Sequence, residues 1–508
     1  MALLVGIDVG TGGVKTIAVD ESGQICARSF REYPLSQPKP GWTEQDPEDW
    51  WQATLETLQD VAGQLGSRAS EIKGIGLSGQ MHSSVFLDGN RQVIRPAILW
   101  NDGRTARQCR WITQEVGQAQ LISHTANKAL EGFTAPKVIW LREEEPENYA
   151  RVRWLMLPKD YVRMRLTGEI YTEVSDAAGT LLFDVANRRW SEAVLSRLNI
   201  DPNILPEVKE SGDCCGYLTQ EVAARTGLPA GIAVAGGGAD NACGAVGAGI
   251  VKTGRALSSI GTSGVVLVQT DNPNPDPEAK VHTFNHGIAH RWYNMGVSLS
   301  AGLSLKWFRD NLGHLEKQVE ALSGYDAYDL LTAQAEDIPP GAEGLLFLPY
   351  LTGERTPHGD ANARGVLCGL SPRHTKGHIV RAILEGVVFA LRDSLEIIKE
   401  LGTTVDEIRA IGGGAKSRLW SQIQADVMNV KIATLNVDEG PAFGAALLAG
   451  VAAGVHASVA EAAEASITTT AIITPNPEAV AVYEAYYREY RALYPVLRDS
   501  FARMAQLS

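Results

Sequence analysis

The chain has 508 residues, which is too long for a single hydrophobic core and predicts two or three domains. Its composition, with 44% hydrophobic and 21% charged residues, is ordinary for a folded globular protein. The net charge of −13 argues against nucleic acid or an anionic membrane as the main partner, because no overall positive field would attract either one. The six cysteines lack CxxC spacing, so neither a zinc site nor a disulfide framework is expected.

No membrane or export signal is evident in the sequence. The first residues run directly into a strand pattern without a basic segment or a cleavage site, so we expect no signal peptide. The longest apolar run, residues 443–455, is shorter than the ~20 residues that a membrane span needs. Its Ala and Gly content instead predicts a closely packed internal helix. We therefore expect a soluble, cytoplasmic protein with no membrane partner.

Residues 3–20 predict a β-hairpin around a glycine-rich turn. The turn residues are Gly10, Thr11, Gly12 and Gly13. Glycine tolerates positive φ and leaves backbone N–H groups uncovered, which makes such a turn a candidate anion-binding nest. Asp8 precedes the turn and is placed to hold Mg²⁺ or its water shell, although an aspartate at a strand end often only caps a turn.

An alternation of helices and strands follows the first hairpin. Residues 47–65 predict an amphipathic helix, and strands are expected at residues 72–77, 85–87 and 232–235. This order is typical of an α/β fold. Small residues then dominate the run at 236–249, as expected where a helix begins against a strand or where two domains meet.

We place the domain boundary near Gly249, which gives domains of residues 1–249 and 250–508. Asp240 follows a strand close to this boundary, among residues too small to block a substrate. Phosphoryl transfer to an alcohol needs a base for the hydroxyl proton, and Asp240 fits that need. An N-cap for a helix that begins at Asn241 is the commoner explanation of such an aspartate, and both roles can coexist.

Residues 256–269 repeat the hairpin pattern, with Gly261, Thr262 and Ser263 at the turn. Gly10 and Gly261 are 251 residues apart (261 − 10), about half of the chain. A single glycine-rich hairpin is often only a tight turn, whereas two copies at this spacing indicate a duplicated fold that grips one phosphate chain. The sequence contains no GxxxxGK[ST] motif, so a P-loop nucleotide site is excluded.

A third glycine cluster, at residues 410–423, follows an apolar strand and opens a helix. The backbone at Gly413, Gly414 and Ser417 could approach a flat ligand such as adenosine, although such turns are common in α/β folds without any ligand. Further on, tyrosines at helical spacing predict a helical packing face that ends near Pro495.

Two longer segments resemble the signatures of the FGGY family of carbohydrate kinases, which are actin-like, ribonuclease-H-like ATPases. They are GFTAPKVIWLREE (residues 132–144) and GVLCGLSPRHTKGHIVRAILE (residues 365–385). Six more resemble the xylulose-phosphorylating branch of that family: WTEQDPEDWW (42–51), GLSGQMHSS (76–84), ILWNDGRT (98–105), LPKDYVRMRLTGE (157–169), SDAAGT (175–180) and LPYLTGERTPH (348–358). The resemblance implies two actin-like domains with a catalytic cleft between them, the first mainly sugar-binding and the second mainly nucleotide-binding.

The same resemblance implies a reaction, ATP + D-xylulose → ADP + D-xylulose 5-phosphate, with Mg²⁺ and in a homodimer. Asp240 would accept the proton, and Asp8 would be the metal-side carboxylate. The substrate-binding residues would be Met81, His82, Trp100, Asn101, Asp102 and Asn241. The ATP phosphates would lie on Gly10, Thr11, Gly12, Gly13, Gly261, Thr262 and Ser263, and the nucleoside would lie on Gly413, Gly414 and Ser417.

Two departures from the family pattern bear on this expectation. Gly12 stands where relatives often have Ser or Thr, so only the backbone can contact phosphate there. Ser83 stands where relatives often have Gly, which puts the fine sugar preference in question.

Two alternatives therefore stay open. One is a sister kinase acting on another ketose, a polyol or gluconate. Gluconate is disfavoured, because its carboxylate requires a cationic side chain and the sugar-facing segments contain only His82 or Arg104 for that purpose. The other alternative is an actin-like or chaperone-like switching ATPase, which leaves the Gln-Met-His turn unexplained.

Overall fold

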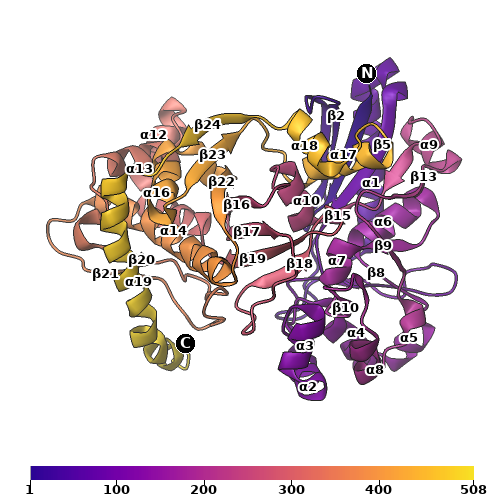
Figure 1. Cartoon of the computed structure of the whole chain (residues 1–508), viewed down its shortest axis with the longest axis horizontal. Helices are drawn as coiled ribbons and strands as arrows, with labels where there is room; N and C mark the ends of the chain where they lie inside the picture. The colour runs from indigo at the N-terminus through magenta and orange to yellow at the C-terminus, as the bar shows by residue number, and fades with distance from the viewer. Residues whose placement is uncertain (1, 508) are drawn as a thin grey trace.

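The computed structural model describes residues 2–507 and consists of two α/β lobes, each built on a mixed β-sheet (Figure 1). The strand order of the first sheet is β13 (Cys214–Tyr217), β14 (Ala233–Ala235), β5 (Ile72–Gly79), β1 (Leu3–Val9), β2 (Gly13–Asp20) and β3 (Ile25–Glu32), and β15 (Gly238–Ala239) also pairs with β5. That of the second is β18 (His282–Asn285), β19 (Trp292–Ser298), β17 (Gly264–Thr270), β16 (Gly254–Ile260), β22 (Val405–Ile411), β23 (Lys431–Leu435) and β24 (Thr469–Ile473).

The two sheets share one pairing pattern, which confirms the predicted duplication and the two actin-like domains. In the first sheet, β1 pairs antiparallel with β2 and parallel with β5, and β5 pairs parallel with β14. In the second sheet, β16 pairs antiparallel with β17 and parallel with β22, and β22 pairs parallel with β23. Both predicted hairpins are therefore the central antiparallel pairs of their sheets.

The local predictions in the first half are also confirmed. The amphipathic helix is α1 (Pro47–Leu65), which Asp46 caps by accepting a hydrogen bond from the Glu48 N–H at 2.9 Å. The strands predicted around it are β5, β6 (Val85–Leu87) and β14. Further helices of the fold are α6 (Pro158–Thr167), α7 (Val174–Ala178), α10 (Asp240–Gly247), α11 (Gly302–Leu312), α13 (Ala327–Glu336), α15 (Gly413–Lys416) and α16 (Arg418–Met428).

Helix α17 (Pro441–Ala452) comes from the C-terminal half of the chain but packs on the first sheet, beside β2 and β5 in Figure 1. Glycines in the strands make this possible. A Cβ on Gly6 would lie 1.9 Å from the Ala442 carbonyl oxygen, and one on Gly76 would lie 2.0 Å from that of Ala445. The helix backbone thus lies directly on the sheet, and the predicted internal helix at 443–455 is confirmed.

Helices α10 and α17 cross between the lobes through a contact made of glycine. A Cβ on Gly444 would lie 1.8 Å from the Cys243 carbonyl oxygen, and one on Gly247 would lie 2.7 Å from that of Gly440. Only residues without a side chain allow this approach. The crossing therefore joins the last helix of the N-terminal half to a helix of the C-terminal half, backbone against backbone.

The predicted end of the last helix near Pro495 is wrong. Helix α19 (Pro477–Met504) continues through Pro495. Tyr483, Tyr490 and, beyond the proline, Phe501 are buried in the core of the second lobe. Proline removes one helical N–H and crowds the preceding turn, but the buried side chains on both sides of it hold the helix in place.

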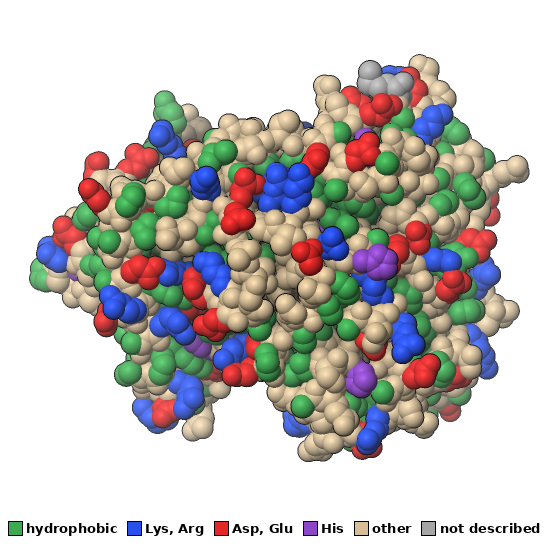
Figure 2. Space-filling model, viewed as in Figure 1, with side chains coloured by type: hydrophobic (Ala, Val, Ile, Leu, Met, Phe, Trp, Pro, Cys, Tyr) green, Lys and Arg blue, Asp and Glu red, His purple; other side chains and the backbone are tan. Residues whose placement is uncertain are grey.

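Within residues 2–507, no helix is long and apolar enough to cross a membrane. On the face drawn in Figure 2, acidic and basic side chains are interspersed, and the surface is indented between the two lobes at the lower edge. All six cysteines are free.

Candidate active site

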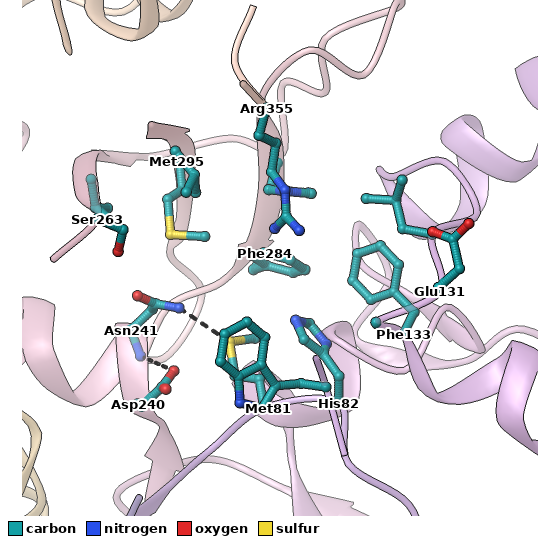
Figure 3. Close-up of a pocket in the computed structure, with 16 residues that line it drawn as sticks. Met81, His82, Glu131, Phe133, Asp240, Asn241, Ser263, Phe284, Met295 and Arg355 are labelled. Atoms are coloured by element: carbon teal, nitrogen blue, oxygen red, sulfur yellow. Dashed lines mark hydrogen bonds between the residues drawn. The ribbon is translucent and has the colours of Figure 1, made fainter. Parts of the chain in front are cut away.

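A cavity of about 270 Å³ lies between the lobes and draws its walls from both of them. The first lobe contributes Met81, His82, Trp100, Leu130, Glu131, Gly132, Phe133, Asp240 and Asn241. The second contributes Ser263, Val265, His282, Phe284, Met295, Val297 and Arg355. The structure thus gathers six of the predicted site residues in one place: Trp100 and the five that Figure 3 labels, Met81, His82, Asp240, Asn241 and Ser263.

Asp240 is the first residue of α10, at the cavity wall. The N-cap is Ala239, so Asp240 does not cap the helix, and its Oδ1 accepts a hydrogen bond from the next backbone N–H, of Asn241, at 2.7 Å. Burial raises the pKa of Asp240 to about 7, the negative charge of Asp8 adds to that shift, and the Asn241 N–H opposes it. A carboxyl group with such a pKa can accept a proton near neutral pH.

Asp8 lies near the end of β1, and its Oδ1 is buried without a hydrogen-bond partner. Burial raises the pKa of Asp8 to about 6, which the nearby Ser78 hydroxyl and the positive charge of Lys15 partly offset. An orphaned carboxylate oxygen suits a cation or its water shell. Among the described residues, no three His, Cys, Asp or Glu side chains form a metal cage. Asp8 therefore fits Mg²⁺, which commonly uses one or two carboxylates together with water and substrate phosphates.

His82 enters the cavity from a turn with left-handed backbone (φ 68°). Its Nδ1 lies 2.6 Å from the carbonyl oxygen of Gly179. A carbonyl only accepts, so Nδ1 carries the proton and Nε2 is left as an acceptor. Burial lowers the pKa of His82 to about 3, and the nearby charges of Lys137 and Arg355 act in the same direction. The imidazole is therefore neutral and suited to accept a hydrogen bond from a hydroxyl group.

Trp100 connects the cavity to the first hairpin. Its Nε1 donates a hydrogen bond to Thr11 Oγ1 at 2.9 Å, and the Thr11 carbonyl accepts one from Gln45 Nε2 at 2.8 Å. Elsewhere in the cavity wall, Asn241 Nδ2 lies 3.4 Å from the sulfur of Met81. The side chains predicted to hold a sugar are thus fixed by contacts with one another and with the hairpin.

Asn101 and Asp102 do not line the cavity. The Asp102 carboxylate accepts hydrogen bonds from Arg104 Nε and Nη2, at 2.8 and 2.7 Å, and from the Thr43 N–H, at 2.6 Å. Asn101 Oδ1 accepts the Thr43 hydroxyl at 2.8 Å. Both side chains therefore serve to hold the loop behind Trp100. Arg104, considered as a cation for an acidic sugar, is occupied in the same way.

A second cavity, of about 450 Å³, gathers the predicted nucleoside residues Gly413, Gly414 and Ser417 with Gly261 and Thr262. Further walls come from α11 and α13 and include Lys306, Tyr328, Asp329 and Thr332. Ser263, next along the chain, lines the first cavity instead. The turn between β16 and β17 therefore separates the two cavities and faces both.

The first turn, with Gly10, Thr11, Gly12 and Gly13, lines neither of these cavities. The Gly10 carbonyl accepts hydrogen bonds from the Tyr33 hydroxyl and from Gln80 Nε2. Gly12 is exposed, and a Cβ on it would meet no atom within 4 Å. Its backbone therefore remains open to an approaching group.

Sequence reasoning missed several walls of the first cavity, above all Phe133, Phe284 and Arg355. Figure 3 shows Arg355 pointing into the cavity from the side opposite His82. Within the described residues, its guanidinium has no hydrogen bond or ion pair. Phe133 and Arg355 lie in the segments GFTAPK and LTGERTPH, whose resemblance to the family indicates membership but not these roles. Phe284, on β18, carries no sequence signal of its role.

Comparison with known proteins agrees with this geometry. Residues 3–247 match the N-terminal domain of the FGGY family of carbohydrate kinases, and residues 256–453 match its C-terminal domain. A xylulose kinase of Bacillus subtilis (strain 168) is 46% identical over 499 residues, 98% of each chain. The crystal structure of xylulose kinase from Rhodospirillum rubrum has a TM-score of 0.90 at 31% identity and covers 98% of this chain and 100% of that one.

The crystal structure of gluconate kinase from Lactobacillus acidophilus has a TM-score of 0.91 at 26% identity and covers 99% of each chain. The fold alone therefore does not separate one sugar from another. The two family domains together span most of the chain, and the full-length relatives are carbohydrate kinases. The chain belongs to the FGGY family of carbohydrate kinases and is an ATP-dependent sugar kinase.

Proposed function

We propose that this protein transfers the γ-phosphate of ATP to D-xylulose and releases ADP and D-xylulose 5-phosphate. The observation that carries the proposal is Asp240, a carboxyl group with a pKa near 7 in a cavity that it shares with Met81, His82 and Asn241. The choice of D-xylulose rests on the similarity to xylulose kinases along nearly the whole chain.

In the proposed mechanism, the terminal hydroxyl of the sugar lies against Asp240, which takes its proton as the new O–P bond forms. His82 Nε2 accepts a hydrogen bond from a second hydroxyl, and Asn241 fixes another sugar oxygen. Arg355 donates hydrogen bonds from the opposite wall. The protein thus supplies orientation and a base, which are the main requirements of phosphoryl transfer besides charge neutralisation.

The nucleoside of ATP would occupy the second cavity, and its phosphates would follow Gly261, Thr262 and Ser263 toward the sugar. Backbone N–H groups of this turn and of Gly12 would donate hydrogen bonds to phosphate oxygens. Asp8 would hold Mg²⁺ through its water shell, and the bound ion would neutralise phosphate charge. Burying these charges between two lobes strengthens each of these interactions.

The proposal includes two domains, residues 1–249 and 250–508, of which the first mainly binds the sugar. It also includes a homodimer and a cytoplasmic location. The change of sheet on either side of α10 supports the boundary near Gly249. Arg355, Phe284 and Met295 of the second domain also line the first cavity, so in this proposal the second domain would contact the sugar as well.

The test is ADP release by the purified full chain with Mg-ATP and a panel of D-xylulose, L-xylulose, D- and L-ribulose, glycerol and gluconate. Gluconate belongs in the panel because Arg355 lines the cavity and, within residues 2–507, its guanidinium makes no hydrogen bond or ion pair. Strong stimulation by D-xylulose supports the proposal, whereas stimulation by another compound keeps the mechanism and changes the substrate. ATP hydrolysis that no sugar changes would favour a switching ATPase and overturn the proposal.

A further inference from the structure

Helix α7 lies behind the sugar cavity and contacts two of its walls. Directly after its C-terminal end, the Gly179 carbonyl accepts the hydrogen bond from His82 Nδ1 at 2.6 Å. In its first turn, Ser175 Oγ accepts the N–H of Ala239 at 3.0 Å, and Ala239 directly precedes Asp240. One short helix therefore joins the imidazole that faces the sugar to the backbone that carries the base.

Glu173 orients the hydroxyl group of Ser175. As the N-cap of α7, Glu173 accepts the N–H groups of Ser175 and Asp176 at 2.7 and 2.8 Å. It also accepts the hydroxyls of Ser175 and Ser211, each at 2.8 Å. Because the Ser175 proton points at Glu173, a lone pair of the hydroxyl oxygen remains for the Ala239 N–H.

A buried charge cluster lies beneath this end of α7. Lys159 Nζ is 2.7 Å from Asp160 Oδ1, 3.0 Å from Asp176 Oδ2 and 3.3 Å from Glu173 Oε1, and all four side chains are 0% exposed. Arg163 completes the cluster: its Nη2 is 3.0 Å from Asp160 Oδ1, and its Nη1 donates to the Gly236 carbonyl at 2.5 Å. The cluster thus contacts both α7 and, at Gly236, the segment that leads to Asp240.

None of these charged groups lines either cavity, so the proposed mechanism does not use them directly. Breaking a buried ion pair leaves a charge uncompensated and is costly, so the contacts of Lys159 with Asp160 and Glu173 oppose rearrangement of the cluster. Burial raises the pKa of Asp176 to about 8, so its carboxyl group is mostly protonated at pH 7. Catalysis in turn depends on placing the base and the hydroxyl partner within fractions of an ångström. A stiff connection between Asp240 and His82 is what the reaction requires.

We propose that Ser175, Glu173, Lys159 and Asp176 are positioning residues that hold Asp240 and His82 in one rigid frame through α7. They touch neither sugar nor nucleotide. The kinetic part of this inference rests on the proposed function, because it assumes Asp240 as the base and His82 as a sugar contact. The claim that α7 holds His82 and the backbone of Asp240 together concerns only the contacts of α7 and does not depend on the proposed function.

The first experiment compares Ser175→Ala with Ser191→Ala. Ser191 is a buried serine of the same lobe whose hydroxyl accepts the Val194 N–H at the start of α8 (Glu192–Leu198), and it lines neither cavity. Ser175→Ala leaves the Ala239 N–H without its acceptor, so we expect kcat to fall by on the order of 10- to 10²-fold with a similar sugar KM. We expect Ser191→Ala to lose stability without a comparable loss of kcat. Asp176→Asn should change kcat in the same direction as Ser175→Ala.

The second experiment uses Gly179→Ala, because φ of −78° at this position suits any residue. Its Cβ would lie 2.7 Å from His82 Nδ1 and would push the imidazole away from the carbonyl. We expect a raised sugar KM with a smaller change in kcat. Imidazole ¹⁵N NMR of the histidine-labelled protein, assigned with His82→Gln, should show the Nδ1–H tautomer in the parent and its loss in the variant.

These readouts separate the two proposals. If no sugar stimulates the parent enzyme, the proposed function fails, while the NMR experiment still tests the contact between α7 and His82. The positioning proposal is overturned if Ser175→Ala and Ser191→Ala both lose stability while their kcat values stay equal to each other. It is also overturned if Gly179→Ala changes neither the sugar KM nor the His82 tautomer. Should Ser175→Ala not fold, Gly179→Ala decides.

Discussion

At the scale of single residues, the two carboxyl groups of Asp240 and Asp8 divide the chemistry. Asp240→Asn keeps the shape of the side chain but cannot accept a proton. We expect kcat to fall by on the order of 10² to 10⁴, the usual contribution of a general base, with sugar binding retained. ADP release measures kcat, and calorimetric titration measures the binding of the sugar. Near-normal turnover in a folded variant would remove the role of Asp240.

The raised pKa of Asp240 also predicts the pH profile. A base works in its unprotonated form, so kcat/KM should fall about tenfold per pH unit below an apparent pKa near 7. An ordinary aspartate would place this acidic limb near pH 4. The check is kcat/KM for the sugar between pH 5.5 and 8.5 at constant ionic strength. A flat profile over this range would contradict the assignment.

The same shift predicts a cost in stability. The pKa of Asp240 is 3.8 in its ordinary state and about 7 in the folded protein, so the folded state binds the proton more tightly. The free energy of unfolding contributed by this group therefore falls as the pH rises from about 4 to about 7. Asn does not titrate, so we expect Asp240→Asn to gain stability over the parent between pH 5 and pH 8. Thermal unfolding at the two pH values measures this gain, and a pH-independent difference would argue against a buried, titrating Asp240.

Arg355 is a cation of the sugar cavity whose guanidinium makes no hydrogen bond or ion pair within residues 2–507, although the charges of Glu354 and Glu131 act on it. Removing its proposed hydrogen bonds to the sugar with Arg355→Met should raise the sugar KM by roughly 10- to 10²-fold, because a hydrogen bond to a charged group contributes about 1.5–3 kcal/mol. Arg355→Lys, which keeps the charge, should show a smaller effect. Initial rates at saturating ATP provide the measurement. An unchanged KM in the Met variant would place Arg355 outside the sugar contacts.

At the scale of elements, the crossing of α10 and α17 depends on Gly444. A Cβ there would lie 1.8 Å from the Cys243 carbonyl oxygen, so Gly444→Ala must force the helices apart. We expect a loss of about 1–3 kcal/mol or more in the free energy of unfolding. Gly63→Ala is the matched control, because Gly63 lies inside α1 with no atom within 4 Å of its would-be Cβ.

The control should move in the opposite direction, by roughly 0.5–1 kcal/mol, since Ala favours a helix more than Gly does. Urea unfolding of both variants compares the two effects. Equal effects from the two substitutions would show that the crossing tolerates a side chain.

The elements also show what a sequence can and cannot predict. Both hairpins and α1 were predictable because their signals are local: glycine turns, β-branched strands and a helical apolar face. Phe284 was not, because it reaches the cavity only through the register of β18 against β19. The helix end at Pro495 failed for the same reason, since packing on both sides of the proline overrides a local rule.

The candidate site was only partly predictable. Asp240, Met81 and His82 lie on motifs with a chemical meaning, and the structure brings them together. Asp102 belongs to a similar motif, yet its carboxylate is occupied by Arg104, a contact that residue spacing does not reveal. Polar residues of one motif thus divide between the site and its support, and only the three-dimensional contacts separate them.

At the scale of the whole molecule, the turn between β16 and β17 stands between the two cavities. Thr262 faces the nucleoside side and Ser263 the sugar side. A phosphate chain that crosses this turn would therefore meet backbone of the second lobe before it reaches Asp240 of the first. The site is complete only when both lobes are present in their mutual arrangement.

The position of α17 has a consequence for how the chain is made. The first sheet ends in sequence at β15, but one of its faces is covered by a helix at residues 441–452. During synthesis, that apolar face stays exposed until most of the chain has left the ribosome, and exposed apolar surface makes the nascent N-terminal half prone to aggregate during that interval. A fragment of residues 1–249 should accordingly aggregate when expressed alone and become soluble when the remainder of the chain is supplied in trans.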